Sequence, residues 1–189
     1  VHHRVKNHRQ IIASLISLHA RAATADEAIE AYASIQRRVD ALSVVHRNHF
    51  AELEDNRGVG VRALVSELSA SLRATAPAAA RKFGIQVDSD DLHITQDVAV
   101  PVAYLVTELV ELAMLADPSA GMRITVRQLD TPGQACLTVA SSALTGTLVT
   151  DPLHDRFDRV LTGLSRQLRA PLERDEIAGS YAIAISAAQ

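Results

Sequence analysis

Tryptophan is absent from this sequence, and aromatic residues of any kind are rare. Phe and Tyr together make up 3% of the 189 residues, whereas hydrophobic residues as a whole make up 48%. The core must therefore be built from Leu, Ile, Val and Ala. Such a composition favours helix bundles and the packing of small aliphatic side chains.

Cysteine and an excess of basic charge are also lacking. Cys136 is the only cysteine, which excludes an internal disulfide and a cysteine-rich metal site, and we expect a cytoplasmic location. The net charge of -3 argues against nucleic-acid binding, because neutralising phosphates requires a basic face. No uninterrupted apolar run approaches the roughly 20 residues that span a bilayer, so we expect no membrane segment in this fragment.

Apolar residues recur at helical spacing in two stretches of the first part of the chain, residues 2–23 and 29–45. An acidic turn at 24–27 separates them. Each helix carries one apolar stripe, and two antiparallel helices cannot bury both stripes alone. Pairing with a second copy would form a four-helix bundle, so we expect a homodimer. The stripe residues include Ile12, Leu15, Tyr32, Ile35, Val39 and Leu42.

A different pattern follows residues 55–60, which we interpret as a linker. Helices and antiparallel strands segregate there, which predicts a two-layer α/β sandwich and an α+β protein overall. The two expected domains are 1–55 and 61–189. The expected helices are 61–75, 98–115 and 156–169, and the expected strands are 84–88, 92–94, 122–127, 135–139 and 180–185.

The motif His3-Arg4-Val5-Lys6-Asn7 stands at the beginning of the first expected helix, and no Gly or Pro interrupts the run that follows. A neutral imidazole is nucleophilic, and a rigid helix would present its ring nitrogen for attack on phosphorus. Arg4 and Lys6 add positive charge where phosphoryl oxygens would lie. Asn7 falls one turn from His3 on the same face. His2 points about 100° away around the helix, and we interpret it as solvated.

This motif resembles the phosphoacceptor helix of the two-component sensor histidine kinases, specifically the HWE-type group and its sibling group with the hallmark His-Arg-x-Lys-Asn. The resemblance implies that His3 is the phosphoacceptor and that Asn7 positions a water that hydrolyses the partner's phosphoaspartate. It also implies a Bergerat-type ATPase fold for the second domain. The implied partner is a response-regulator receiver domain, which would supply its own Mg²⁺.

Residues 105–113 resemble the N box of the kinases' ATPase domain, but they depart from it at two positions. Glu108 agrees with the box, whereas Thr107 stands where its first Asn belongs and Leu112 where the magnesium-binding Asn belongs. Mg²⁺ prefers oxygen ligands, and Leu112 has none. After the central strand, where the family places an Asp-x-Gly that holds adenine, this chain has Ser141 and no nearby carboxylate or glycine.

The glycine-rich lid of the family is replaced by the acidic, glycine-free segment 151–156. Such a segment would repel a triphosphate and lacks the backbone freedom to cradle one. An alternative alignment makes Asp151 the adenine ligand, but the magnesium ligand is still missing. We therefore expect a degenerate nucleotide site, no ATP binding and no cofactor bound by this chain. The residues of this degenerate site are Thr107, Glu108, Leu112 and Ser141.

His46 and His49, three residues apart, could in isolation suggest a metal pair. We favour a solvated role at the end of the bundle, because no third ligand is nearby in the sequence, and we expect no metal site. The remaining histidines are interpreted as surface residues: His8, His19, His93 and His154.

Four functions are compatible with these features. The first is a histidine phosphotransferase of a phosphorelay, in which His3 exchanges a phosphoryl group with a receiver aspartate. The others are a kinase-like phosphatase that uses Asn7, a divergent autophosphorylating kinase, and a non-catalytic scaffold that sequesters a response regulator. The intact His3 and its charged neighbours argue against the scaffold, because nothing structural requires that run on a solvated helix face.

Overall fold

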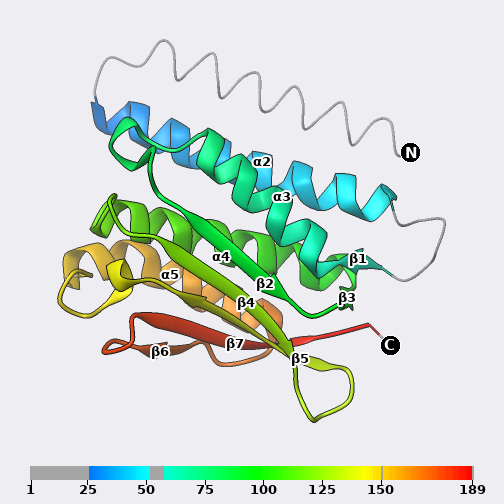
Figure 1. The fold of residues 1–189 in the computed structure, drawn as a ribbon. Coiled ribbons are helices and arrows are strands. Elements are labelled where there is room, and N and C mark those ends of the chain that lie inside the picture. The colour runs from blue at the N-terminus through cyan, green and yellow to red at the C-terminus, as the bar shows by residue number, and fades with distance from the viewer. Residues whose placement is uncertain (1–25, 52–57, 150, 189) are drawn as a thin grey trace.

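The computed structural model describes residues 26–51, 58–149 and 151–188 (Figure 1). Its α-helices are α2 (Asp26–Ala51), α3 (Val61–Ala74), α4 (Gln96–Ala116) and α5 (Asp151–Leu168), with short 3-10 helices η1 (Ala78–Ala80) and η2 (Ser142–Leu144). Its strands are β1 (Val59–Gly60), β2 (Ile85–Ser89), β3 (His93–Ile94), β4 (Met122–Gln128), β5 (Gln134–Ala140), β6 (Glu173–Asp175) and β7 (Ser180–Ser186). The expected mixed α+β fold is confirmed.

Five strands form one sheet in the order β2-β4-β5-β7-β6. The β2–β4 pair is parallel and the other neighbours are antiparallel. Alternate residues of β4 are buried, namely Met122, Ile124 and Val126, as expected for a sheet with one face against a core. The opposite face of β4 carries Arg123 and Arg127, which are exposed.

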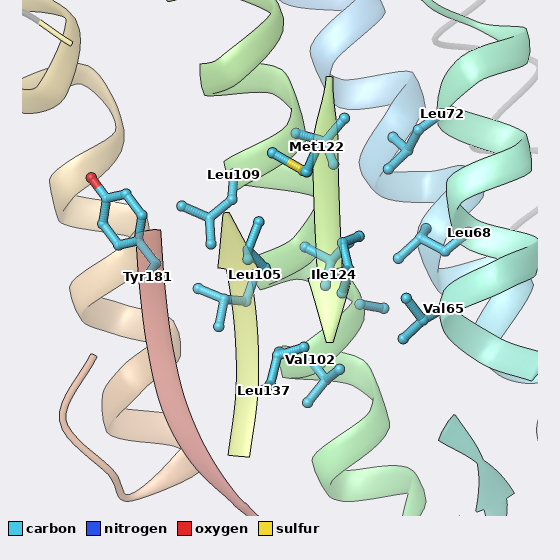
Figure 2. Packing of buried hydrophobic residues seen from close by; sticks show 14 of the residues in the cluster. Val65, Leu68, Leu72, Val102, Leu105, Leu109, Met122, Ile124, Leu137 and Tyr181 are labelled. Atoms are coloured by element: carbon cyan, nitrogen blue, oxygen red, sulfur yellow. The ribbon is translucent and has the colours of Figure 1, made fainter. Parts of the chain in front are cut away.

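Three helices, α3, α4 and α5, cover the apolar face of the sheet (Figure 1). Figure 2 shows how residues of α3 and α4 meet Ile124 of β4 and Leu137 of β5 in this layer. Helix α4 lies at the centre, and most of its residues are buried. The contributing side chains include Val65, Leu68 and Leu72 of α3 and Val102, Leu105 and Leu109 of α4.

Helix α4 is strongly apolar, and it is longer than the apolar runs expected from the sequence. A stretch of 18 residues within this 21-residue helix has a mean hydropathy of 1.8, which by length and composition alone would suit a membrane span. However, 78% of that apolar window is buried inside the fold. The helix is therefore the central core helix of the α/β layer, buried from several sides at once.

Helix α2 packs against α3 and α4 through one of its faces. Ala41, Val44 and Val45 are fully buried there. A different face carries Ile29 and Ile35, whose side chains remain 45% and 42% exposed. The sequence predicted a single stripe on this helix, whereas the structure reveals two apolar faces. The exposed face belongs to the expected dimer stripe, whose other members Tyr32, Val39 and Leu42 are half-buried.

Two expected boundaries need correction. Val59 and Gly60, which were assigned to the linker, form a short strand that pairs with β3. Helix α5 begins at Asp151, five residues before the expected start at residue 156. The first half of the helical hairpin, including Ile12 and Leu15, lies outside the described residues, so the dimeric four-helix bundle stays a prediction.

Candidate functional site

The phosphoacceptor motif lies outside the described residues. This applies to all four of its predicted functional residues, His3, Arg4, Lys6 and Asn7. Their roles in phosphotransfer stay predictions from the motif. His2, His8 and His19 also lie outside the described residues.

The candidate nucleotide site lies within the described residues. Its N-box positions are on α4, and their side chains are buried. Thr107 is fully buried, and its hydroxyl donates a hydrogen bond of 2.8 Å to the carbonyl of Ala103 within the same helix. Leu112 is 0% exposed and belongs to the hydrophobic core. Neither side chain offers a free polar atom to a ligand.

Glu108, the N-box residue that agrees with the family, is 1% exposed and is held by Arg38 of α2. The guanidinium donates from Nε to Oε1 at 2.6 Å and from Nη2 to Oε2 at 2.8 Å. This fork-shaped arrangement occupies both carboxylate oxygens and is the strong, bidentate form of an arginine–carboxylate pair.

A second pair lies one helical turn further along α4. Arg37 donates to Glu111, with Nη2 2.9 Å from Oε1 and Nε 3.3 Å from Oε2. Ser34 joins the two pairs, because its hydroxyl donates to Glu111 and accepts from Arg38 at 2.9 Å. We call these five residues the Arg–Glu network: Ser34, Arg37, Arg38, Glu108 and Glu111.

The electrostatics of this network favour its charged form. The hydrogen bond to Glu108 raises the pKa of Arg38 above its ordinary value, and the charges of Glu108 and Glu111 act in the same direction, while burial opposes them. Tyr104, one turn before Glu108, has its phenolic pKa raised by burial. Glu108 is thus held by a cation, and its carboxylate faces α2.

Ser141, at the position of the family's adenine-binding Asp, is buried and serves to fix the loop after β5. Its hydroxyl donates to the carbonyl of Gly121 and accepts from the amide of Ala143 at the beginning of η2. The carbonyl of Ser141 lies close to Gly179, which has a φ of 66°, and a Cβ there would come within 2.3 Å of it. This turn therefore requires glycine at position 179.

Helix α5 replaces the lid and packs directly against α4. Its residues Phe157, Leu161 and Leu164 are buried in the common core. The side chain of Asp151, the alternative adenine ligand, lies outside the described set. Leu112 of α4 belongs to the same hydrophobic core as these α5 residues.

A hollow of about 490 Å³ lies at one end of the sheet, where β2 and β4 begin and β5 ends. Gly84, Gln86, Arg123 and Ser142 are among its lining residues. None of Thr107, Glu108 or Leu112 lines it. Ser141 is the one member of the degenerate site that borders this hollow.

Within the described ranges 26–51, 58–149 and 151–188, no group of three or more His, Cys, Asp or Glu side chains is arranged so that it could hold a metal ion. His46 is half-buried on α2 and interacts with neighbouring groups. The side chain of His49 is outside the described set. His93 and His154 are half-buried, so they are less exposed than expected for surface residues.

The Arg–Glu network was not predicted from the sequence. One signal was available: Glu108 and Glu111 interrupt an otherwise apolar helix, and a buried carboxylate must have a partner. The identity of that partner was not available, because Arg37 and Arg38 precede these carboxylates by about 70 positions.

Comparisons with known proteins fit this geometry. Residues 1–76 match the family model described as histidine kinase, HisKA_2. Among curated proteins, no sequence matches this chain. The predicted resemblance to the histidine kinases is confirmed by this match, which covers the residues of the motif.

Three solved structures illustrate the likeness of the fold. The blue-light activated histidine kinase EL346 of Erythrobacter litoralis is similar over 97% of this chain, with a TM-score of 0.65 and 19% identity, and the chain spans 60% of that kinase. The separate histidine kinase domain of EL346 gives a TM-score of 0.60 and 14% identity over 94% of this chain and 95% of its own. The Acinetobacter baumannii histidine kinase AdeS gives 0.52 and 10% over 98% of this chain and 97% of its own.

Proposed function

We propose that this chain, which resembles the two-component sensor histidine kinases of the HWE type, is a histidine phosphotransferase that exchanges phosphoryl groups with response-regulator receiver domains and does not bind ATP. One contrast carries the proposal. The acceptor motif from His3 to Asn7 is complete, whereas the nucleotide positions of the second domain are committed to other contacts.

The proposed reaction needs no nucleotide. A lone pair on the His3 ring attacks the phosphorus of a receiver phosphoaspartate, and a phosphorus–nitrogen bond forms. The phosphorus–oxygen bond breaks, and the aspartate carboxylate leaves with that electron pair. The receiver supplies Mg²⁺ and the acidic pocket, while Arg4 and Lys6 balance the charge of the phosphoryl oxygens. Reversal of the same steps passes the group to a second receiver.

Three observations support the loss of ATP binding. Leu112 is buried in the core and has no oxygen for Mg²⁺. Glu108 is paired with Arg38 through both carboxylate oxygens. The hydroxyl of Ser141 is engaged in two hydrogen bonds that fix the loop after β5. Each contact stabilises the fold at a position where the family would place a nucleotide-binding group.

A homodimer is part of the proposal. Ile29 and Ile35 remain exposed on the face of α2 that does not pack against α3 and α4. The first expected helix has its own apolar stripe, which includes Ile12 and Leu15. Together the two stripes supply the core of a four-helix bundle formed by two copies. A cytoplasmic location suits this assembly and its receiver partner.

The proposal is tested with receiver domains phosphorylated by radiolabelled acetyl phosphate. The wild-type chain should gain acid-labile label as the receiver loses it, and His3→Ala should gain none. His2→Ala is the matched control and should retain most transfer, because its ring points elsewhere around the helix.

Asn7→Ala separates phosphotransfer from phosphatase action. This variant should still accept label on His3 but release phosphate to water more slowly. If His3→Ala drains the receiver at the wild-type rate while Asn7→Ala stops the loss, the protein is a phosphatase. If neither substitution changes the receiver's phosphate, the motif has no chemical role and the scaffold function replaces our proposal.

A further inference from the structure

The Arg–Glu network joins two parts of the chain that the sequence separates. Ser34, Arg37 and Arg38 lie on α2, in the expected hairpin, and Glu108 and Glu111 lie on α4, at the centre of the ATPase-like layer. Each carboxylate has its own arginine, and the Ser34 hydroxyl links the pairs. Both carboxylates are almost fully buried.

The apolar part of this interface gives little directional preference. Ala41, Val44 and Val45 are small side chains, and α4 presents a long apolar surface that includes Val110 and Met114. The hydrophobic effect is non-directional, so the burial of such side chains alone gives little preference for one register along α4 over its neighbours. A shift of α2 by one turn along α4 would break both arginine pairs and could re-form at most one of them, because the two carboxylates are themselves one turn apart. At least one carboxylate would then be buried without an arginine, which is a costly arrangement. The network therefore selects one register.

We propose that the Arg–Glu network is a latch between the hairpin and the ATPase-like domain, which holds α2 on α4 in a single register and orientation. The surface on α4 is an acidic pair one turn apart within apolar surroundings, and its occupant is the adjacent arginine pair of α2 in the same chain. Glu108, at an N-box position, here receives an arginine of the hairpin. The latch does not depend on the phosphotransfer reaction.

The chain offers a matched control on the same helix. Arg47 of α2 pairs with Glu67 of α3 at 2.6 Å, but the two side chains are 59% and 40% exposed. Glu67 also accepts a hydrogen bond from Asn48. This pair has the same chemistry in water, where ion pairs contribute little and are screened by salt. A latch must depend on the buried pairs and be insensitive to the exposed one.

Hydrogen–deuterium exchange followed by mass spectrometry on the full chain tests the latch. Arg38→Glu should raise exchange in α2 peptides by at least about tenfold while β4, β5 and β7 stay protected. Arg38→Lys keeps the charge but loses the fork, so it should give an intermediate increase. The double variant Arg38→Glu with Glu108→Arg should restore much of the protection, and Arg47→Glu should leave it near the wild-type level.

Three results would overturn the latch. The first is wild-type exchange of α2 in Arg38→Glu. The second is an equal increase in Arg47→Glu, which would make any charge change on α2 sufficient. The third is a joint loss of protection in α2 and the sheet strands, seen even with the milder Arg38→Lys and Glu111→Gln. That result would make the network part of one cooperative core.

Discussion

The hydroxyl oxygen of Ser141 lies 2.7 Å from the carbonyl oxygen of Gly121 and donates a hydrogen bond to it, which fastens the end of β5 to the beginning of β4. The same hydroxyl accepts from the amide of Ala143. Where the resembling kinases place a carboxylate for adenine, this chain thus has a side chain that ties two strands together.

Replacing this serine tests its structural role. Ser141→Ala removes both hydrogen bonds and should lower the free energy of unfolding by about 1–3 kcal/mol, because the buried amide of Ala143 and the partly buried carbonyl of Gly121 lose a partner. Urea denaturation measures the change. Ser142→Ala is the control, since Ser142 is exposed, and its stability should match that of the wild type. Equal stability of all three proteins would contradict a fastening role.

ATP with Mg²⁺ should not bind to the chain. The N-box position of the magnesium ligand is held by Leu112, which has no oxygen and is fully buried. Isothermal titration calorimetry should give no saturation below about 100 μM, which corresponds to a binding free energy near -5.5 kcal/mol. An ATP-binding histidine kinase domain under the same conditions is the positive control. A tighter dissociation constant would show that a nucleotide site survives.

The exposed face of α2 should mediate dimerisation. Light scattering at micromolar concentration should give twice the chain mass of 20.3 kDa. Ile35→Glu places a charge on that face and should shift the protein towards the monomer. Ile177→Glu is the control, because Ile177 is 95% exposed in the turn between β6 and β7. A monomeric wild type, or an unchanged dimer in Ile35→Glu, would contradict the proposed interface.

The raised pKa of Asp40 predicts that the stability of the protein depends on pH. Burial raises the pKa of this carboxyl, although a hydrogen bond from Gln36 and the charge of Arg47 oppose the rise. The folded state therefore binds the proton more tightly than the unfolded state, and stability falls as pH rises from the ordinary Asp pKa of about 3.9 through the raised value. Asp40→Asn should stabilise the protein at pH 7, and the gain should vanish at pH values below that window.

The pKa of Asp117 is shifted in the opposite direction to that of Asp40. Hydrogen bonds from the Ser119 hydroxyl and amide lower the pKa of Asp117, so its contribution to stability is present above its ordinary pKa and is lost as pH falls through the lowered value. Asp117→Asn should therefore destabilise at pH 7, with a difference that shrinks in acid. Thermal melts across pH compare the two variants: destabilisation by Asp40→Asn at pH 7 would contradict the first assignment, and stabilisation by Asp117→Asn would contradict the second.

The regular core elements could be predicted from the sequence because their patterns are strong. The alternation at 122–127 matched β4, and the helical period at 61–75 matched α3 to within one residue. Strand β6, with the sequence Glu-Arg-Asp, has no such pattern and is a strand because β7 pairs with it. Helix α5 begins earlier than expected, which the sequence permits because proline, here at position 152, is tolerated in the first turn of a helix.

The candidate site likewise has features that could be predicted from the sequence and others that could not. Leu112 and Ser141 could be recognised as departures from the family because the motif fixes their positions. The partners that these departures have acquired could not, because Arg38 and Glu108 meet only through the docking of α2 on α4. Sequence chemistry indicates that a buried carboxylate requires a cation, and the fold decides which arginine supplies it.

The short β1–β3 sheet has a mechanical consequence. β1 begins one residue after the segment 52–57, which separates the two expected domains in the sequence, and it pairs with β3 at Val59 and Gly60. His93 of β3 accepts a hydrogen bond of 2.7 Å from the amide of Ala188, two residues beyond β7 (Figure 1). A displacement of β1 would thus be passed through backbone hydrogen bonds to the residues after β7, in addition to α3, which begins at Val61 directly after β1.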